Sequence, residues 1–277
     1  MRRRQRRTDG GAMARMPLAA AAGALCAAAV WPGCNAIVGI EAPVREDATA
    51  ATEAGSGSAG AGGAQPDCTL LEVSPEETLE LSMIDDMEDG NIGILKGDGA
   101  TPRQGAWFTY SDGSEGGAQE PSDLAELVAA MMPARGDSER AVHTSGNDLF
   151  TKWGAGTGFR LNGAYYDATD YRGITFWARA EEGSPTGLSV TFVDQQTDPG
   201  GGICGDKKGQ VPCFDHFHTS VPLTSDWKHF KVPVGCLVQT GYGLFEAPAQ
   251  DRIQAIQFSF GPGQAFDFWI DDVAFYK

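Results

Sequence analysis

The sequence lacks the short motifs of the commonest catalytic sites. It contains no Gly-x-Ser-x-Gly elbow, no His-Glu-x-x-His zinc motif and no phosphate-binding glycine loop, since the glycine run at 200–202 is not followed by a helical segment. These absences argue against the familiar hydrolase, metalloprotease and nucleotide-binding patterns. A glycosidase needs only two carboxylates beside a cleft, and with 37 acidic residues the sequence leaves that class open.

Basic residues are also scarce, and long apolar runs are missing. The chain has 21 Lys and Arg against 37 Asp and Glu, a net charge of −16. Nucleic acids and anionic lipid surfaces require a cationic surface, so this balance argues against both as partners. The longest apolar run, residues 18–30, is too short to cross a bilayer comfortably. No period of 20 to 50 residues repeats, which argues against a solenoid or propeller.

The apolar run at 18–30 has the flanks of an export signal. Arginines precede it, and Gly33 and Cys34 close it, as a small residue and a cysteine close bacterial lipoprotein signals. The pattern predicts a lipoprotein-type signal peptide over residues 1–33 and a lipid on Cys34, which would hold the protein to a membrane of the cell envelope. A plain secretory signal is the alternative, because Trp31 stands where Leu is usual.

Between this signal and the folded part lies a stretch of low complexity. Residues 42–65 consist almost entirely of Ala, Gly, Ser, Thr and charged residues and include no aromatic residue. Such a composition buries too little apolar area to offset the entropy lost on ordering. We therefore expect a flexible tether over residues 34–66 and a single folded domain over residues 67–277.

The cysteines of the expected domain predict two disulfides. Four remain after the signal, at Cys68, Cys204, Cys213 and Cys236, and an even set in an oxidising compartment is typical of disulfide bonding. Three pairings are possible. The short separation of Cys204 and Cys213 favours a bond that closes one loop, which leaves Cys68 to pair with Cys236.

The domain sequence predicts an all-β fold. Short segments rich in β-branched and aromatic residues recur between Gly, Pro, Asp and Ser. Alternation along them, as at Ile256, Phe258 and Phe260, predicts two packed antiparallel sheets, hence a β-sandwich or jelly roll. Residues 122–132 instead have a helical composition with a capping residue, so a helix is the alternative there. The expected strands are 79–87, 105–110, 140–144, 158–161, 173–180, 188–194, 228–234, 253–260 and 266–275.

Acidic residues interrupt the first and last of these strands. Glu88 and Asp89 follow the first, and Asp271 and Asp272 lie within the last. Buried carboxylates are costly unless a cation or hydrogen bonds compensate them. If the two strands are neighbours, these four acids can converge on Ca²⁺, which accepts six to eight oxygens in loose geometry. The alternative is that the acids point to solvent.

These segments resemble a known family. The strand ending Met-Glu-Asp-Gly-Asn (87–91), the Gly-Ile-Thr-Phe-Trp-Ala strand (173–178) and the Ile-Asp-Asp-Val-Ala-Phe strand (270–275) are similar to those of galactose-binding-like jelly rolls. Among these they most resemble family 11 carbohydrate-binding modules and related domains of exported bacterial lipoproteins. The resemblance implies a β-sandwich, a structural calcium joining the terminal strands, and β-glucan-type ligands on a concave sheet. The loop between Cys204 and Cys213 and the segment 215–218 depart from the family pattern.

Sugar binding requires aromatic faces for C–H groups and polar side chains for hydroxyls. The predicted ligand-binding rings are Trp107, Tyr110 and Trp177, with Gln257 as a hydroxyl partner. Trp107 and Tyr110 differ in parity, so a regular strand places only one of them on a given face. Further candidate rings are Trp153, Tyr165, Tyr166 and Tyr242.

A second polar set surrounds the predicted loop disulfide. It comprises Asp194, Asp215, His216 and His143, with His218 two residues beyond His216. The set supplies candidate sugar contacts. His216 and His218 share one face of a strand, which a zinc or copper site with His143 could also use, and a purely structural loop is the further alternative, since an exposed histidine pair in a loop is commonly incidental.

Together these observations predict an exported, non-catalytic and monomeric protein that binds polysaccharide or oligosaccharide. A surface-interaction β-sandwich without sugar binding is one alternative. A β-sandwich glycoside hydrolase or lyase is another, and a carboxylate pair about 5–10 Å apart in the groove would support it.

Overall fold

The computed structural model describes residues 66–97 and 101–277, so the predicted signal, Cys34 and nearly all of the tether lie outside it. Within the described ranges no helix has the length and apolar character needed to cross a membrane. In the part of the chain that the structure describes, the regular elements are twelve strands and four short 3₁₀ helices. The helices are η1 (Leu124–Glu126), η2 (Pro199–Gly201), η3 (Val234–Cys236) and η4 (Gln250–Arg252).

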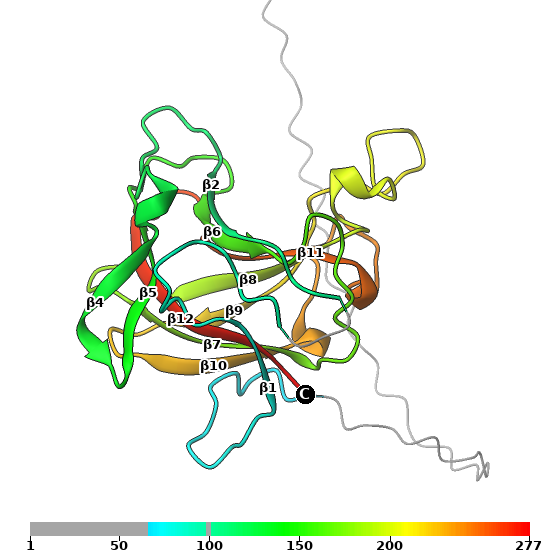
Figure 1. Ribbon diagram of the computed structural model, residues 1–277. Helices are drawn as coiled ribbons and strands as arrows, with labels where there is room; N and C mark the ends of the chain where they lie inside the picture. Colours follow the sequence, from blue (N-terminus) through cyan, green and yellow to red (C-terminus); the bar gives the residue numbers. More distant parts are fainter. Residues whose placement is uncertain (1–65, 98–100) are drawn as a thin grey trace, which may run out of the picture. The chain divides into compact units, whose positions relative to one another are not determined.

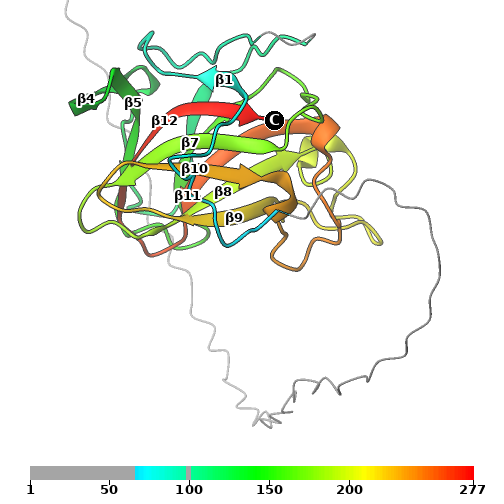
Figure 2. The same ribbon diagram turned by 90° about the horizontal axis from the view of Figure 1, so that it is seen from below.

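The strands form two antiparallel sheets, as the sequence predicts (Figures 1 and 2). The seven-stranded sheet has the order β10-β7-β12-β5-β3, with β1 paired to β12 and β4 paired to β5. Its strands are β1 (Leu81–Asp85), β3 (Gln119–Glu120), β4 (Val128–Arg135), β5 (Ser138–Gly146), β7 (Gly173–Ala180), β10 (Lys228–Pro233) and β12 (Phe266–Tyr276). The five-stranded sheet has the order β2-β6-β11-β8-β9. Its strands are β2 (Trp107–Ser111), β6 (Ala155–Arg160), β8 (Gly187–Asp194), β9 (Phe217–Pro222) and β11 (Ile253–Phe260).

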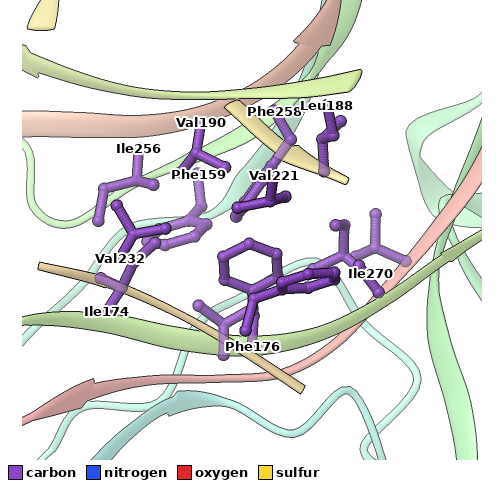
Figure 3. Close-up of a cluster of buried hydrophobic side chains, with 14 of the residues drawn as sticks. Phe159, Ile174, Phe176, Leu188, Val190, Val221, Val232, Ile256, Phe258 and Ile270 are labelled. Carbon is purple, nitrogen blue, oxygen red and sulfur yellow. The ribbon is translucent and has the colours of Figure 1, made fainter. Parts of the chain in front are cut away.

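The hydrophobic core lies between the inner faces of the two sheets (Figure 3). Phe176 on β7 and Phe258 on β11 meet there from opposite sheets, with ring centroids 5.0 Å apart in an edge-to-face arrangement. Side chains alternate on each strand, so that Ile256 and Phe258 are buried while Gln257 between them is only partly covered. Removal of such side chains from water stabilises the fold by about 1.5–3 kcal/mol each. The alternation also leaves a polar outer face on the five-stranded sheet.

All nine predicted strands are present, within a few residues of their expected ends. The helix at 122–132 is wrong, because within this segment only η1 is helical and residues 128–132 belong to β4. Pairing of Val128 with Val142 on β5 supplies backbone hydrogen bonds that outweigh the local helix preference. The strands β3, β4 and β9 were not predicted.

The predicted pairing of the terminal strands and the predicted disulfides are confirmed. Strands β1 and β12 pair antiparallel, so the acid-bearing ends of the domain are neighbours. Disulfides join Cys68 to Cys236 and Cys204 to Cys213, which is the pairing that the spacing favours. The first ties the start of the domain to η3, and the second closes the loop after η2.

The two disulfides are expected to contribute unequally to stability. In the chain-entropy model, the cross-link between residues separated by 168 positions stabilises by about 5 kcal/mol, and the one separated by 9 positions by about 3 kcal/mol. We therefore expect the double variant Cys68→Ala, Cys236→Ala to unfold at lower denaturant than Cys204→Ala, Cys213→Ala. Equilibrium urea unfolding of both variants measures the difference, and the reverse order would contradict it.

Candidate functional site

Of the four acids at the terminal strands, Glu88 and Asp271 meet at the hydroxyl of Ser138. The Ser138 hydroxyl lies 3.0 Å from a Glu88 carboxylate oxygen and 2.8 Å from Oδ2 of Asp271. Arg135 donates to Asp271 through Nε at 3.0 Å and Nη2 at 2.6 Å, and it also reaches Asp272 at 2.5 Å. Burial raises the pKa of Asp271, and the charge of Arg135 opposes that shift. An arginine thus neutralises the pair of acids on β12.

These contacts do not fit a calcium site at the four predicted residues. The guanidinium of Arg135 donates to Oδ2 of Asp271. The carboxylate of Asp89 instead accepts from the backbone and side chain of Asn91. Among the described residues no group of three or more His, Cys, Asp or Glu side chains is arranged to hold a metal ion. Calcium therefore stays a prediction of the sequence that this arrangement does not support.

Its test is the melting temperature of metal-free protein with and without added Ca²⁺. An ion bound only by the folded state raises that temperature by mass action. A rise with Ca²⁺ but not with Mg²⁺ would support the prediction and would require Arg135 to release Asp271. Equal melting temperatures would contradict it.

The outer face of the seven-stranded sheet carries an aromatic and arginine stack that includes two predicted ligand residues. Trp177 stacks on His229 with ring centroids 4.8 Å apart, and Arg135 lies 4.6 Å above the Trp177 ring. His143 stacks on Trp269 at 3.9 Å. These side chains cover one another and the sheet beneath them. Trp177 and His143 lie on the seven-stranded sheet, whereas Gln257 lies on the five-stranded sheet, so the three residues do not form one site. The stack continues through Arg179 and Trp227.

The outer face of the five-stranded sheet is hollowed into a groove of about 780 Å³. The register across the sheet aligns its polar floor in two rows. In one row Gln257 on β11 lies opposite Thr191 on β8, and Thr191 lies opposite His218 on β9. In the other row Ser259 on β11 lies opposite Ser189 on β8. The groove is lined by Tyr110, Trp153, Ser189, Thr191, Phe214, Asp215, His216, His218, Thr240, Tyr242, Gln257 and Ser259.

Strand β6 presents glycines instead of side chains to the groove floor. Its Gly158 pairs with Gln257, and its Gly156 pairs with both Ser259 and Tyr110. A Cβ at Gly156 would lie 2.1 Å from the carbonyl oxygen of Phe258, and one at Gly158 would lie 2.5 Å from that of Ile256. The backbones approach too closely for any larger residue, so the space between Tyr110 and Gln257 stays open.

Aromatic rings line the groove at both ends of this floor. Tyr110 on β2 stacks on Trp153 with centroids 5.9 Å apart, and 54% of Trp153 remains exposed. Tyr242 is 52% exposed and Phe214 is 66% exposed, so both present ring faces to solvent. Burial raises the pKa of the Tyr110 hydroxyl, although a hydrogen bond with Ser259 opposes the shift, so the phenol stays neutral.

Two buried carboxylates hold the loops that carry the exposed rings. Asp112 accepts from the amides of residues 152–154 at 2.8–3.0 Å, and Trp153 is the middle residue of that run. Asp215 accepts from the amides of residues 240–243, which place Tyr242. Burial alone raises the pKa of Asp215, but hydrogen bonds from Thr240 and these amides outweigh it and lower the pKa to about 2. Asp215 lines the groove while its oxygens serve the loop.

The remaining predicted residues take structural positions. Trp107 is buried in the core, where its Nε1 donates to Asp85 at 2.7 Å, and so only Tyr110 of that pair reaches the groove. Asp194 is buried behind His216 and accepts from Thr197 and from the amide of Ala249. The structure therefore brings together Tyr110, Asp215, His216 and Gln257. It places Trp107, His143, Trp177 and Asp194 elsewhere.

Sequence reasoning missed part of the groove. Trp153 and Tyr242 were only candidate rings, and Phe214 was not considered. The two aspartates gave no signal, because the amides around Trp153 and Tyr242 that they bind lie far from them along the chain. The alternation of glycine in β6 was the available signal. The positions of Thr240 and Ser189 had none, since only the folded register brings them to the floor.

Through Asp215, we expect both the stability of the protein and the placement of the Tyr242 ring to depend on pH in the acid range. Its pKa falls from an ordinary 3.8 to about 2 on folding, so it stabilises the protein above about 4 and loses that effect as the pH falls toward 2. The contribution is on the order of 2 kcal/mol. We expect Asp215→Asn to lower the melting temperature at pH 7 and to reduce the difference between pH 7 and pH 3.

The exposed Asp206 provides a control in the neighbouring loop. Asp206→Asn should leave the melting temperature and its pH dependence unchanged. If both variants behave alike, the amides around Tyr242 do not depend on the Asp215 carboxylate.

Comparison with known proteins adds a family to this geometry. Residues 102–277 match the family model described as carbohydrate binding domain 30. Among solved structures, the chain is similar to the family 11 carbohydrate-binding module of cellulosomal cellulase Lic26A-Cel5E of Clostridium thermocellum, at 16% identity over 72% of this chain and 95% of that chain, with a TM-score of 0.45. It is also similar to the family 30 module of cellulosomal cellulase Cel9D-Cel44B of Clostridium thermocellum, at 15% identity over 71% and 97% of the two chains, with a TM-score of 0.44.

A family 11 module from Clostridium thermocellum, solved in complex with a β-1,3-1,4-mixed-linked tetrasaccharide, is 16% identical over 72% of this chain and 96% of that chain, with a TM-score of 0.46. No curated protein matches the chain.

Proposed function

The chain belongs to the carbohydrate binding domain 30 family, and on that premise we propose that the groove of the five-stranded sheet binds an uncharged β-glucan without cleaving it. The observation that carries the proposal is the combination of exposed rings and a polar floor in one hollow. Trp153 and Tyr242 offer flat apolar faces, and Gln257 offers an amide between them on the strand at the centre of the sheet.

The physical requirements of sugar binding are met by these side chains. Pyranose rings present C–H groups on their faces, which pack on aromatic rings, and hydroxyls around their edges, which need donors and acceptors. The stack of Tyr110 and Trp153 is held by Asp112, and the ring of Tyr242 is held by Asp215, so neither ring has to be ordered when ligand binds. Preorganised contacts reduce the entropic cost of association.

The charge of the groove favours a neutral glycan. No Lys or Arg is among the described residues that line it, and the single carboxylate among them, that of Asp215, accepts hydrogen bonds from loop amides. A uronic acid or sulfated sugar would find no cation there and would meet a chain of net charge −16. Unsubstituted glucans carry no such penalty.

The rival functions lack support from the groove. A glycoside hydrolase needs two carboxylates that face a substrate, and the groove lining of the described chain contains one, already bound to backbone. A surface-interaction protein without sugar binding would not need preordered exposed rings around a polar floor. We therefore keep carbohydrate binding as the function.

Export remains part of the proposal. The two disulfides suit an oxidising compartment outside the cytoplasm. Attachment through a lipid on Cys34 is supported only by the signal pattern in the sequence. A lipid at the start of a tether would leave the groove of the domain free to meet polysaccharide at the cell surface.

The exposed rings are expected to carry most of the affinity. Trp153→Ala and Tyr242→Ala each remove a ring face, which should weaken binding roughly tenfold, or about 1.4 kcal/mol. Affinity gel electrophoresis with mixed-linkage β-glucan measures the loss as reduced retardation.

Leu244→Ala is the matched control, because Leu244 is 76% exposed in the loop of Tyr242 but does not line the groove. Trp177→Phe, on the other sheet, should also keep the parent's retardation. Equal retardation of the parent and both groove variants would refute the proposed site, and a loss confined to Trp177→Phe would move the site to the seven-stranded sheet.

A further inference from the structure

Two histidines in the groove wall use the same ring edge for contacts within the protein. Nδ1 of His216 lies 2.8 Å from the hydroxyl oxygen of Thr197, and Nδ1 of His218 lies 3.1 Å from the backbone carbonyl of His216. Both imidazoles line the groove. The protonation of each Nδ1 decides what the opposite nitrogen, Nε2, offers to a ligand.

The partner of His216 determines its tautomer. The Thr197 hydroxyl donates to Oδ1 of Asp194 at 2.8 Å, and both oxygens of that carboxylate also accept from N–H groups, so the hydroxyl proton points to Asp194. Its oxygen then accepts from Nδ1–H of His216. Burial lowers the pKa of His216, while the charges of Asp194, Asp198 and Asp215 oppose that shift and His218 adds to it, so the ring favours its neutral form. A neutral imidazole with hydrogen on Nδ1 carries a lone pair on Nε2.

The partner of His218 gives the same result more simply. A backbone carbonyl has no proton to donate, so Nδ1 of His218 must carry the hydrogen. In its neutral form this ring also has a free lone pair on Nε2.

Both Nε2 atoms are open to solvent. Neither forms a hydrogen bond with any described residue, and no buried side-chain nitrogen or oxygen in the described ranges lacks a partner. An unpartnered atom must therefore be accessible. Since the Nδ1 edges face the protein, the Nε2 edges face the groove that both rings line.

We propose that His216 and His218 present a pair of hydrogen-bond acceptors to bound glycan and so select a sugar whose hydroxyls at this wall are free to donate. This inference rests on the proposed function of the groove. An ether or ester oxygen at that position has no proton and would leave both lone pairs unpaired. A site built to bond a hydroxyl discriminates strongly against an analogue that lacks it. Thr197 acts as a positioning residue, because it sets the tautomer of His216 without reaching the groove.

Imidazole ¹⁵N NMR tests the inference directly. The chain has four histidines, and His143 and His229 lie on the outer face of the other sheet, so they serve as internal controls. We expect His216 and His218 to show hydrogen on Nδ1 in the free protein. Adding the β-1,3-1,4-mixed-linked tetrasaccharide should shift both Nε2 resonances and leave those of His143 and His229 in place.

A pair of variants then separates positioning from folding. Thr197→Val removes the hydroxyl that accepts from His216, so the hydrogen should redistribute toward Nε2 and the affinity for the tetrasaccharide should fall about tenfold, the value of one hydrogen bond. Thr197→Ser keeps the hydroxyl and should keep both tautomer and affinity. Melting temperatures of the two variants show whether the fold is retained.

The outcomes distinguish this inference from the function beneath it. Binding of the tetrasaccharide with unmoved Nε2 resonances, or hydrogen found on Nε2 in the free protein, would overturn the acceptor pair alone. Retention of affinity in Thr197→Val together with a changed tautomer would do the same. No binding of any mixed-linkage glucan would overturn the proposed function and this inference with it.

Discussion

The groove depends on one recurring interaction, the capture of consecutive backbone amides by a buried carboxylate. Asp112 binds the amides around Trp153, and Asp215 binds those around Tyr242. Exposed aromatic rings on free loops would lose mobility only when ligand arrives, and that loss would oppose binding. Each carboxylate instead satisfies three or more donors before ligand is present. The hydrogen bonds also hold the carboxylates ionised within a buried setting. The buried carboxylates of Asp112 and Asp215 therefore hold the ring faces of Trp153 and Tyr242 in place.

The two outer faces of the sandwich carry similar residues, but the rings are covered on one face and exposed on the other. On the seven-stranded sheet, Trp177 and Trp269 are covered by arginines whose charges are balanced by Asp271 and Glu181. Such stacks of planar groups satisfy one another and leave little for a partner. On the five-stranded sheet β6 contributes glycines to the outer face, and among the described residues no arginine or lysine lines the groove. Composition alone does not separate the faces, since both carry aromatics and histidines, and the difference lies in which rings have arginine above them.

The fold could largely be predicted from the sequence, because alternation and turn residues report on single strands. The terminal strands carried a second kind of information, since buried acids such as Asp271 require a partner. The sequence identified that requirement but not its solution, because Arg135 is separated from Asp271 by 136 positions and lies on β4, a strand that was not predicted. The site was predicted in part for a related reason. Alternation opposed Gln257 to Ile256 and Phe258 and allowed only one of Trp107 and Tyr110 on a given face. It does not say which sheet a strand joins, so Trp177 was grouped with them.

The same limit explains why the histidines were undecided between metal and sugar. Spacing of two residues places His216 and His218 on one face, which serves either chemistry. A metal needs a third ligand, and the candidate, His143, stacks on Trp269 in the other sheet. The positions of the imidazole hydrogens decide between the two: Thr197 and a backbone carbonyl each accept a hydrogen bond from Nδ1–H, and each Nε2 is left as an acceptor where a hydroxyl-bearing ligand would lie. In a groove without cations, acceptors of this kind complement the donors that an uncharged glycan carries at every ring.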